Sequence, residues 1–201
     1  MIAAFARPAR VARALLAVVV VAALALAPSA PGAGTPKPVT VRDGIDAMHG
    51  APDLVLVQLG VAPSGRLRAV LGLAAPWLPR DLLARRGPPG SFCLRLWTRS
   101  KPGATPPDYL VCVTARADGE TTRGSVLRVR AGRPLQRVAG ARVGRTSQSD
   151  ATLRFSQAAI GRPGTVRFAA EATKAGCGGL ACVDTAPAAP RTATLRVRRG
   201  T

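Results

Sequence analysis

Histidine, glutamate and aromatic residues are scarce in this chain, and their scarcity argues against catalysis. Among its 201 residues there is 1 histidine, and only 3% of the residues are aromatic. His49 lies in the turn-like stretch AMHGAPD, and no G-x-S-x-G motif is present, so no nucleophile and base form a catalytic pattern. A glycosidase needs two carboxylates that flank one bond. Glu120 lies in a turn and Glu171 at a strand end, without an obvious partner for either. We expect a protein that is not an enzyme.

Acidic residues are absent from the first 42 positions, where the chain resembles a secretory signal. Arg7, Arg10 and Arg13 precede an uncharged run at 14–27, and a segment rich in small residues and proline follows. The run has 14 residues, short of the ~20 that a membrane-spanning helix needs. We predict a signal peptide and linker at residues 1–33, with cleavage after Ala25 or Ala33. An uncleaved membrane anchor is the alternative.

Removal of residues 1–33 leaves 168 residues, which favours a single domain at 34–201. The removed part contains three arginines and no acid, so the formal charge falls from +19 to +16. The expected product is secreted, either extracellular or associated with the cell surface, and does not span a membrane after processing.

Short segments of alternating apolar and polar residues fill the remaining chain, and helical periodicity is nearly absent. Glycine, proline and aspartate clusters separate these segments. The pattern predicts an all-β fold, an antiparallel β-sandwich of the jelly-roll or immunoglobulin-like type with about 8–10 strands. One exception, at 79–86, is predicted as a short helix. The predicted strands lie at 38–42, 54–61, 66–73, 92–98, 109–116, 125–130, 135–143, 151–155, 165–172 and 192–198.

Two cysteines predict the register of one hairpin. If Cys93 lies opposite Cys112 in an antiparallel pair, six apolar side chains of the two strands fall on one face. A slip by one residue would destroy that agreement. Directly opposed residues are close enough for a disulfide to join them. In this register the apolar side chains that share a face are paired as Phe92 with Val113, Leu94 with Val111 and Leu96 with Tyr109.

The other two cysteines, Cys177 and Cys182, enclose only GGLA, and we expect them to close a surface loop. Four cysteines allow three pairings, of which 93–112 with 177–182 is the prediction. Zinc binding is the competing hypothesis, but structural zinc sites use two close pairs of cysteine or histidine. An exported chain also meets an oxidising compartment, which favours disulfides.

Three aspartates, Asp43, Asp46 and Asp53, gather in the segment RDGIDAMHGAPDL. Calcium takes several oxygen ligands from carboxylates and loop carbonyls, so this segment is a candidate site for a structural calcium ion. Alternatively, the aspartates form Asx-turns before strands, because their spacing matches no EF-hand pattern.

The same segment carries a resemblance to a known family. The residues DGID at 43–46, APDLVLV at 51–57 and PDYLVCV at 107–113 are similar to the opening strands of family 9 carbohydrate-binding modules and DOMON-like β-sandwiches. The chain departs from that pattern at Gly44, which precedes Ile45 rather than the second aspartate. The resemblance covers about residues 40–115. It implies a sandwich, a structural calcium ion and an ancestry in sugar or cofactor binding.

Sugar binding normally uses exposed aromatic platforms, for which the chain offers two tryptophans. In the predicted hairpin Trp97 shares the outer face with Arg95, and Trp77 lies in the loop LAAPWLPR. Either ring is a candidate for stacking on a ligand, and the alternative is a ring packed under a loop, which is the more frequent place for tryptophan.

Arginines alternate with apolar residues along several predicted strands, which places positive charge on the solvent face. A merely solvated surface explains this pattern, and the functional alternative is electrostatic attachment to a polyanion such as an acidic wall polymer, anionic lipid or extracellular nucleic acid. Specific nucleic-acid binding is not expected, because no aromatics interleave with the charges. The candidates for binding are Arg95, Arg128, Arg130, Arg154, Arg167, Arg196 and Arg198.

The predicted function is a non-catalytic module that attaches to an anionic cell-surface polymer. A carbohydrate-binding module that uses an exposed tryptophan is the alternative. A structural secreted protein without a ligand, whose arginines are merely solvated, is a third hypothesis.

Overall fold

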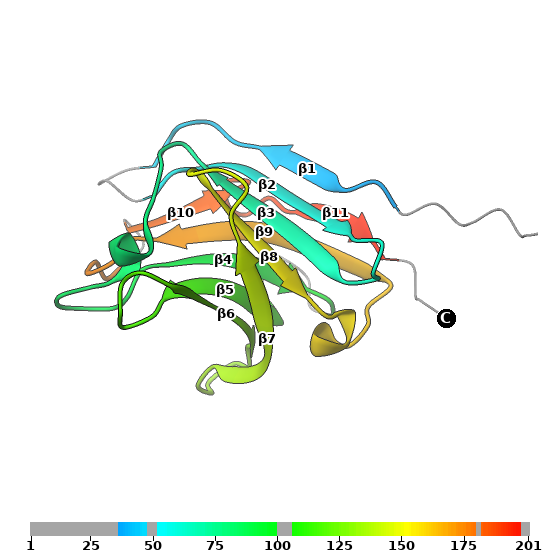
Figure 1. Ribbon diagram of the computed structural model, residues 1–201. Coiled ribbons are helices and arrows are strands. Elements are labelled where there is room, and N and C mark those ends of the chain that lie inside the picture. The colour runs from blue at the N-terminus through cyan, green and yellow to red at the C-terminus, as the bar shows by residue number, and fades with distance from the viewer. Residues whose placement is uncertain (1–35, 48–51, 100–105, 180–181, 198–201) are drawn as a thin grey trace, which may run out of the picture. The chain divides into compact units, whose positions relative to one another are not determined.

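The domain is built from antiparallel strands (Figure 1). The computed structural model describes residues 36–47, 52–99, 106–179 and 182–197, which belong to one compact unit, Gly34–Thr201. Within these residues no helix is long and apolar enough to cross a membrane. The described helical elements are two short 3-10 turns, η1 (Pro79–Leu82) and η2 (Gln157–Ile160). The strands are β1 (Val39–Arg42), β2 (Leu54–Val61), β3 (Leu67–Leu73), β4 (Ser91–Trp97), β5 (Tyr109–Ala115), β6 (Thr122–Arg128), β7 (Gln136–Gly144), β8 (Asp150–Phe155), β9 (Thr165–Thr173), β10 (Val183–Ala186) and β11 (Ala193–Arg196).

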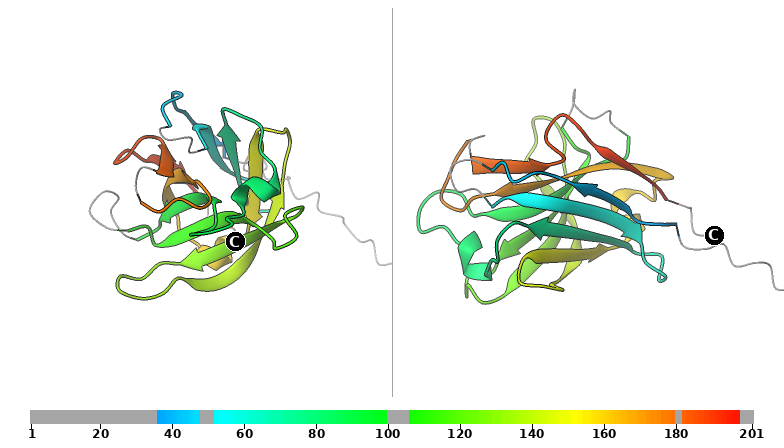
Figure 2. Two further views of the ribbon diagram at one scale, coloured as in Figure 1. Left: turned by 90° about the vertical axis from the view of Figure 1, so that its left-hand side faces the viewer. Right: turned by 90° about the horizontal axis from the view of Figure 1, so that it is seen from above.

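All eleven strands join in one sheet that is nearly closed as a barrel (Figures 1 and 2). The order is β1-β2-β3-β8-β7-β6-β5-β4-β9-β10, and β11 pairs with the other half of β9. At the open seam β2 contacts β9 and β10, and β1 contacts β11. The prediction of an all-β antiparallel fold is confirmed. The predicted sandwich is not confirmed, because β7 joins both halves of the molecule into one sheet.

Strand β7 makes this connection by changing partners along its length. Its first part pairs with β6, and Arg142–Gly144 pairs with β8. The ladder between β6 and β7 shifts register between Val126 and Leu127, and such a bulge bends a strand. At Gly124 a Cβ would lie only 2.1 Å from the Ala141 carbonyl oxygen, so this close approach requires glycine.

The interior is filled by the inward side chains of almost every strand. In β3, for example, Leu67, Ala69 and Leu71 are fully buried while the residues between them are partly exposed. Burying one such leucine stabilises the fold by about 1.5–3 kcal/mol. Because inward and outward residues alternate strictly in an extended strand, the sequence pattern also decides which residues face the solvent.

The hairpin of β4 and β5 has the predicted register. Cys93 is paired with Cys112 across the strands, their Cα atoms are 4.0 Å apart, and a disulfide joins them. In the chain-entropy model, a disulfide that closes a loop of this size stabilises the fold by about 3 kcal/mol. The apolar residues of the two strands are buried on the inner side: Phe92, Leu94, Leu96, Tyr109, Val111 and Val113.

The second predicted disulfide, between Cys177 and Cys182, is also present. It closes the loop between β9 and β10. Strand β10 itself was not predicted, because its four residues, VDTA, turn a polar Asp184 inward. The short helix predicted at 79–86 is a single 3-10 turn, η1, which ends at Leu82.

Candidate functional site

Three arginines lie side by side on the outer face of the sheet. Arg68 in β3 is directly opposite Arg154 in β8, and Arg154 is directly opposite Arg142 in β7. Leu67 and Leu153, their neighbours along the chain, are fully buried, so strand alternation turns the arginines outward. We call Arg68, Arg154 and Arg142 the arginine row.

The arginine row lines a groove of about 710 Å³. Gly60 in β2 lies directly opposite Arg68, so the groove extends across the sheet from the row to β2. A Cβ at Gly60 would lie 2.8 Å from the Cβ of Pro38, which shows how closely the chain segment before β1 approaches at this end. Besides the row, the lining includes Pro38, Gln58, Gly60, Arg66 and the turn at 61–64.

The arginine row concentrates positive charge without a matching acid. Directly opposed residues have Cβ atoms ~4.5–5.5 Å apart, and like charges in that position destabilise a sheet. A guanidinium stays protonated in proteins, so the row cannot relieve this repulsion by losing a proton. Among the described residues no carboxylate forms an ion pair with the row or with Arg66. The groove is therefore open to an anion from outside the chain.

Two polar groups near the groove are buried without a hydrogen-bond partner in the described structure. One is Nε of Arg68, and the other is Oγ1 of Thr152, a residue only 4% exposed. Thr152 lies opposite Val70 and Gly144, in the cross-strand line next to the arginine row. A buried polar group without a partner costs about 1–3 kcal/mol.

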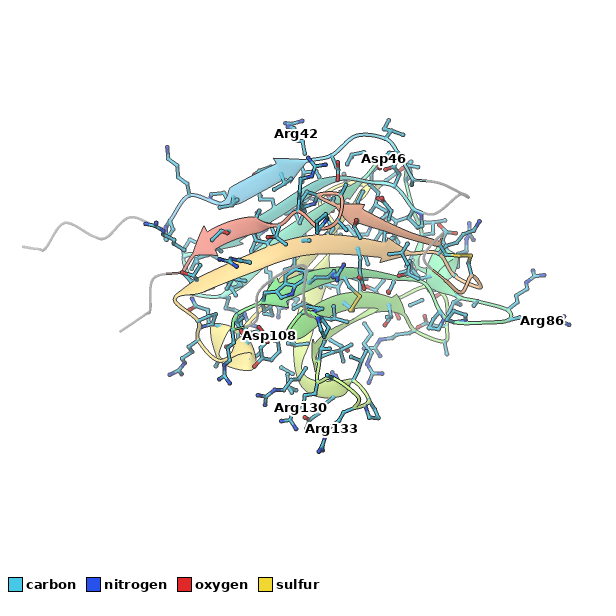
Figure 3. The ribbon with its side chains drawn as sticks, turned by 180° about the vertical axis from the view of Figure 1, so that it is seen from behind. Arg42, Asp46, Arg86, Asp108, Arg130 and Arg133 are labelled. Carbon is cyan, nitrogen blue, oxygen red and sulfur yellow. A yellow bond between two sulfur atoms is a disulfide. The ribbon has the colours of Figure 1, made fainter. Side chains whose placement is uncertain are left out.

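Most of the arginines predicted to bind a polyanion lie away from this groove. Arg167 in β9 and Arg196 in β11 are exposed on the other half of the sheet. Arg130 projects from the connection between β6 and β7, on the side of the molecule opposite to Arg42 and Asp46 (Figure 3). Arg198 lies outside the described residues. The predicted arginines do not form one continuous face, because the curled sheet turns its outer surface in different directions.

Arg95 is not a free surface charge. Its Nε is 3.5 Å from Oε2 of Glu171, and its guanidinium carbon lies 5.2 Å from the centre of the Trp97 ring. Burial raises the pKa of Glu171, and the positive charge of Arg95 opposes this shift. Glu171 therefore serves as a partner for arginine. Glu120 lies in the turn after β5, where its backbone N–H donates to Asp118 Oδ1 at 2.9 Å.

Arg128 has the opposite orientation to the predicted one. It lies opposite Tyr109, whose ring belongs to the core, and therefore emerges on the same side of β6 as the buried Val126. Leu127, predicted to face inward, is on the outer side and only partly buried. The prediction failed because β6 has apolar residues on both sides, so the local sequence does not decide which side faces the core.

Both tryptophans are covered, so of the two alternatives the packed ring holds and neither residue offers an exposed stacking platform. Trp77 and Trp97 are each only 5% exposed. The Trp77 ring packs edge-on against Phe92 with centroids 4.8 Å apart, and the guanidinium of Arg145 lies 4.5 Å from its centre. Trp97 lines a small pocket of about 140 Å³ together with residues of the connection between β10 and β11.

A second group of like charges lies at the seam of the sheet. Carboxylate oxygens of Asp46, Asp53 and Asp184 lie within 4.8 Å of one another. We call these three residues the acidic cluster. Asp184 Oδ2 accepts a hydrogen bond of 2.6 Å from the backbone N–H of Leu54, which links β10 to the start of β2. Burial raises the pKa of Asp184, its backbone hydrogen bonds oppose this, and Asp53 and Asp46 raise it further.

The acidic cluster differs by one residue from the predicted calcium site. Asp43 is not part of it, and its Oδ1 accepts instead from the backbone N–H of Gly44 at 3.1 Å. Asp184 takes the place of Asp43 as the third carboxylate. Oδ1 of Asp53 is buried without a hydrogen-bond partner in the described structure. The donors present suit a hard cation that prefers oxygen ligands, and calcium binding stays a prediction.

Sequence reasoning missed four residues that the structure brings into the groove or into the acidic cluster. Arg66, Arg68 and Arg142 each lie next to buried or partly buried apolar residues, so alternation did indicate that they face outward. What the sequence lacked was the pairing of β3 with β8 and of β8 with β7. For Asp184 the pattern carried no usable signal, because β10 is so short. His49 lies outside the described residues.

Comparison with known proteins gives no relative from which a function could be transferred. No protein-family model, curated protein or solved structure matches the chain. The resemblance to family 9 carbohydrate-binding modules and DOMON-like domains therefore stays a prediction, and the function has to be argued from the geometry.

Proposed function

We propose that this domain is a non-catalytic module that binds an anionic polymer along the arginine row. The observation that carries the proposal is the direct alignment of Arg68, Arg154 and Arg142 in a groove, without an ion-pair partner among the described residues. A polymer with several negative charges can pair with all three at once. The second and third contacts then form at a high effective concentration.

The lining of the groove supports binding rather than catalysis. Beside the arginines it contains glycine, proline, alanine, valine, Gln58 and Ser64, and none of these is a general base. Guanidinium groups bind carboxylates, sulfates and phosphates through two parallel hydrogen bonds. The chemistry on offer is therefore recognition of an anion.

Two disulfides in one small domain are compatible with an extracellular location, because such bonds persist in oxidising compartments. We propose that the chain is exported under the direction of residues 1–33 and meets its polymer outside the cytoplasm. A site for neutral sugar built on Trp77 or Trp97 is not part of this proposal, since both rings are covered.

The test compares two triple variants of the full chain that change the net charge equally. R68Q/R142Q/R154Q removes the arginine row, and R130Q/R167Q/R196Q removes three exposed arginines elsewhere. On an immobilised acidic polysaccharide, wild type and the second variant should be retained at low salt and released at high salt. The first variant should pass through. Equal loss of retention in both variants would show that only net charge matters, and would refute the proposal.

A further inference from the structure

The groove has two chemically different halves in one line across the strands. The charged half contains Arg68, Arg154 and Arg142, aligned across β3, β8 and β7. Beyond Arg68 the same line continues to Gly60 in β2, and Gln58 lines the groove beside it. A ligand that fills both halves must cross the strands rather than follow one of them.

The spacing of the strands sets the spacing of the charges. Neighbouring strands are ~4.7–4.9 Å apart, so the backbone positions of Arg68 and Arg142 are separated by ~10 Å. A linear polymer with one acidic group on each repeat can place successive charges on successive arginines. The row then pairs with three consecutive acidic groups, and longer chains extend beyond it.

Building on the function proposed above, we propose that the ligand is an acidic polysaccharide that lies across β3, β8 and β7. Its acidic groups pair with the arginine row, and a further part of the sugar chain lies over Gln58 and Pro38. The Gln58 side chain and the Ser64 hydroxyl can exchange hydrogen bonds with sugar hydroxyls. Gln58 Nε2 donates to Thr40 Oγ1 at 2.8 Å, which holds the side chain in place. The backbone of Gly60 is buried beside Pro38, so the sugar chain meets this end of the groove at Pro38 and Gln58.

The groove lining favours this class over the other polyanions. Single-stranded nucleic acid is normally held by aromatic side chains that stack on its bases, and the lining contains no aromatic residue. An anionic membrane presents a broad surface, whereas the arginine row is set in a concave groove that fits an extended chain.

Among the three arginines of the row, Arg68 should contribute most to binding. It is half-buried, its Nε has no hydrogen-bond partner in the described structure, and its neighbours Arg154 and Arg142 are exposed. Much of the cost of removing its guanidinium from water is therefore already incurred in the free protein. Replacement of Arg68 should weaken binding more than replacement of Arg142, although both changes remove one charge.

The experiment measures the affinity of the full chain for oligogalacturonates of increasing length, by titration calorimetry at low salt. Affinity should rise steeply up to three acidic residues, which pair with the aligned row, and more slowly beyond that, because Arg66 adds one further charge to the groove. R68Q should weaken binding of the trimer about tenfold, since it removes a charge-assisted hydrogen-bonding group. R142Q should weaken it about threefold, as for an exposed ion pair. R167Q, on the other half of the sheet, should leave the affinity unchanged.

The outcomes separate this inference from the proposed function. If affinity keeps rising in proportion to length with no break near three, or if R68Q and R142Q have equal effects, the geometry proposed for the ligand is wrong while polymer binding stands. The same holds if poly(glycerol phosphate), single-stranded DNA or anionic vesicles compete better than galacturonates. If no anionic polymer binds at low salt, both the inference and the proposed function fail.

Discussion

The arginine row and the acidic cluster each bring three like charges together, but they are neutralised in different ways. Burial raises the pKa of Asp184, and the nearby carboxylates of Asp53 and Asp46 raise it further, so the acidic cluster can lower its charge by protonation of Asp184. The guanidiniums of the row have no such route, because arginine does not lose its proton in proteins. An acidic cluster can therefore persist without a ligand, whereas an arginine row depends on counter-ions or a bound anion.

Their positions in the fold match this difference. The acidic cluster lies at the seam where the sheet does not close, and Asp184 links β10 to β2 through the backbone N–H of Leu54. Its main role is thus structural. The arginine row lies on the outer surface of the central strands β3, β8 and β7, and none of its side chains holds two parts of the chain together through an ion pair in the described structure. We infer that its repulsion is tolerated for the sake of binding.

The largest effect is expected from the variant R154E, which places a carboxylate between Arg68 and Arg142. Binding of the acidic polymer should fall by tenfold or more, on the order of the cost of disrupting a charge pair at an interface. At the same time the free energy of unfolding should rise by about 0.5–1 kcal/mol, because the repulsion between neighbouring arginines is replaced by attraction to a carboxylate. Polymer binding and urea unfolding would be measured side by side. R167E serves as the control, and a destabilised R154E would contradict the claim that the row is strained by its own charge.

A smaller effect is expected from calcium on the acidic cluster. A calcium concentration about ten times the dissociation constant stabilises the fold by about 1.4 kcal/mol, which should raise Tm by about 3–5 °C for a domain of this size. The variant D184N should lose the response, and R154Q should keep it. If calcium raises the Tm of D184N as much as that of wild type, calcium binds elsewhere. If calcium does not change the Tm of wild type, the acidic cluster is not a calcium site.

The smallest effect concerns pH, measured in the presence of a chelator. Because the folded-state pKa of Asp184 is raised, its protonated form stabilises the fold below the ordinary value of about 3.9, and this stabilisation is lost as the pH rises through the raised value. The variant D184N should therefore be more stable than wild type at pH 7 and similar to it at pH 4. Urea titrations of both proteins across this range would show it, and parallel pH profiles would contradict it.

The strands and disulfides were predictable because their signals are local. In the hairpin of β4 and β5, alternation and the cysteine pair agree on a single register, and the structure has that register. The orientation of Arg128 was not predictable in this way. Residues on both sides of β6 include apolar ones, so only packing against Tyr109 decides which side faces inward.

The arginine row was beyond the reach of sequence reasoning for a different reason. Its members come from strands far apart in the chain, and they align only because β3 pairs with β8 and β8 pairs with the end of β7. The burial of Trp77 and Trp97 depends in the same way on loops that pack over them. Asp184 joins the acidic cluster through a strand too short to show a pattern.

The sequence by itself determined the all-β class, nearly every strand, both disulfides and the outward direction of Arg154, which lies between two apolar residues of an alternating strand. Only the tertiary structure decided that β7 bends from one half of the sheet to the other and that three outward arginines share one line. The reason is that strand neighbours are chosen by the packing of the whole core, and no short stretch of sequence contains that information.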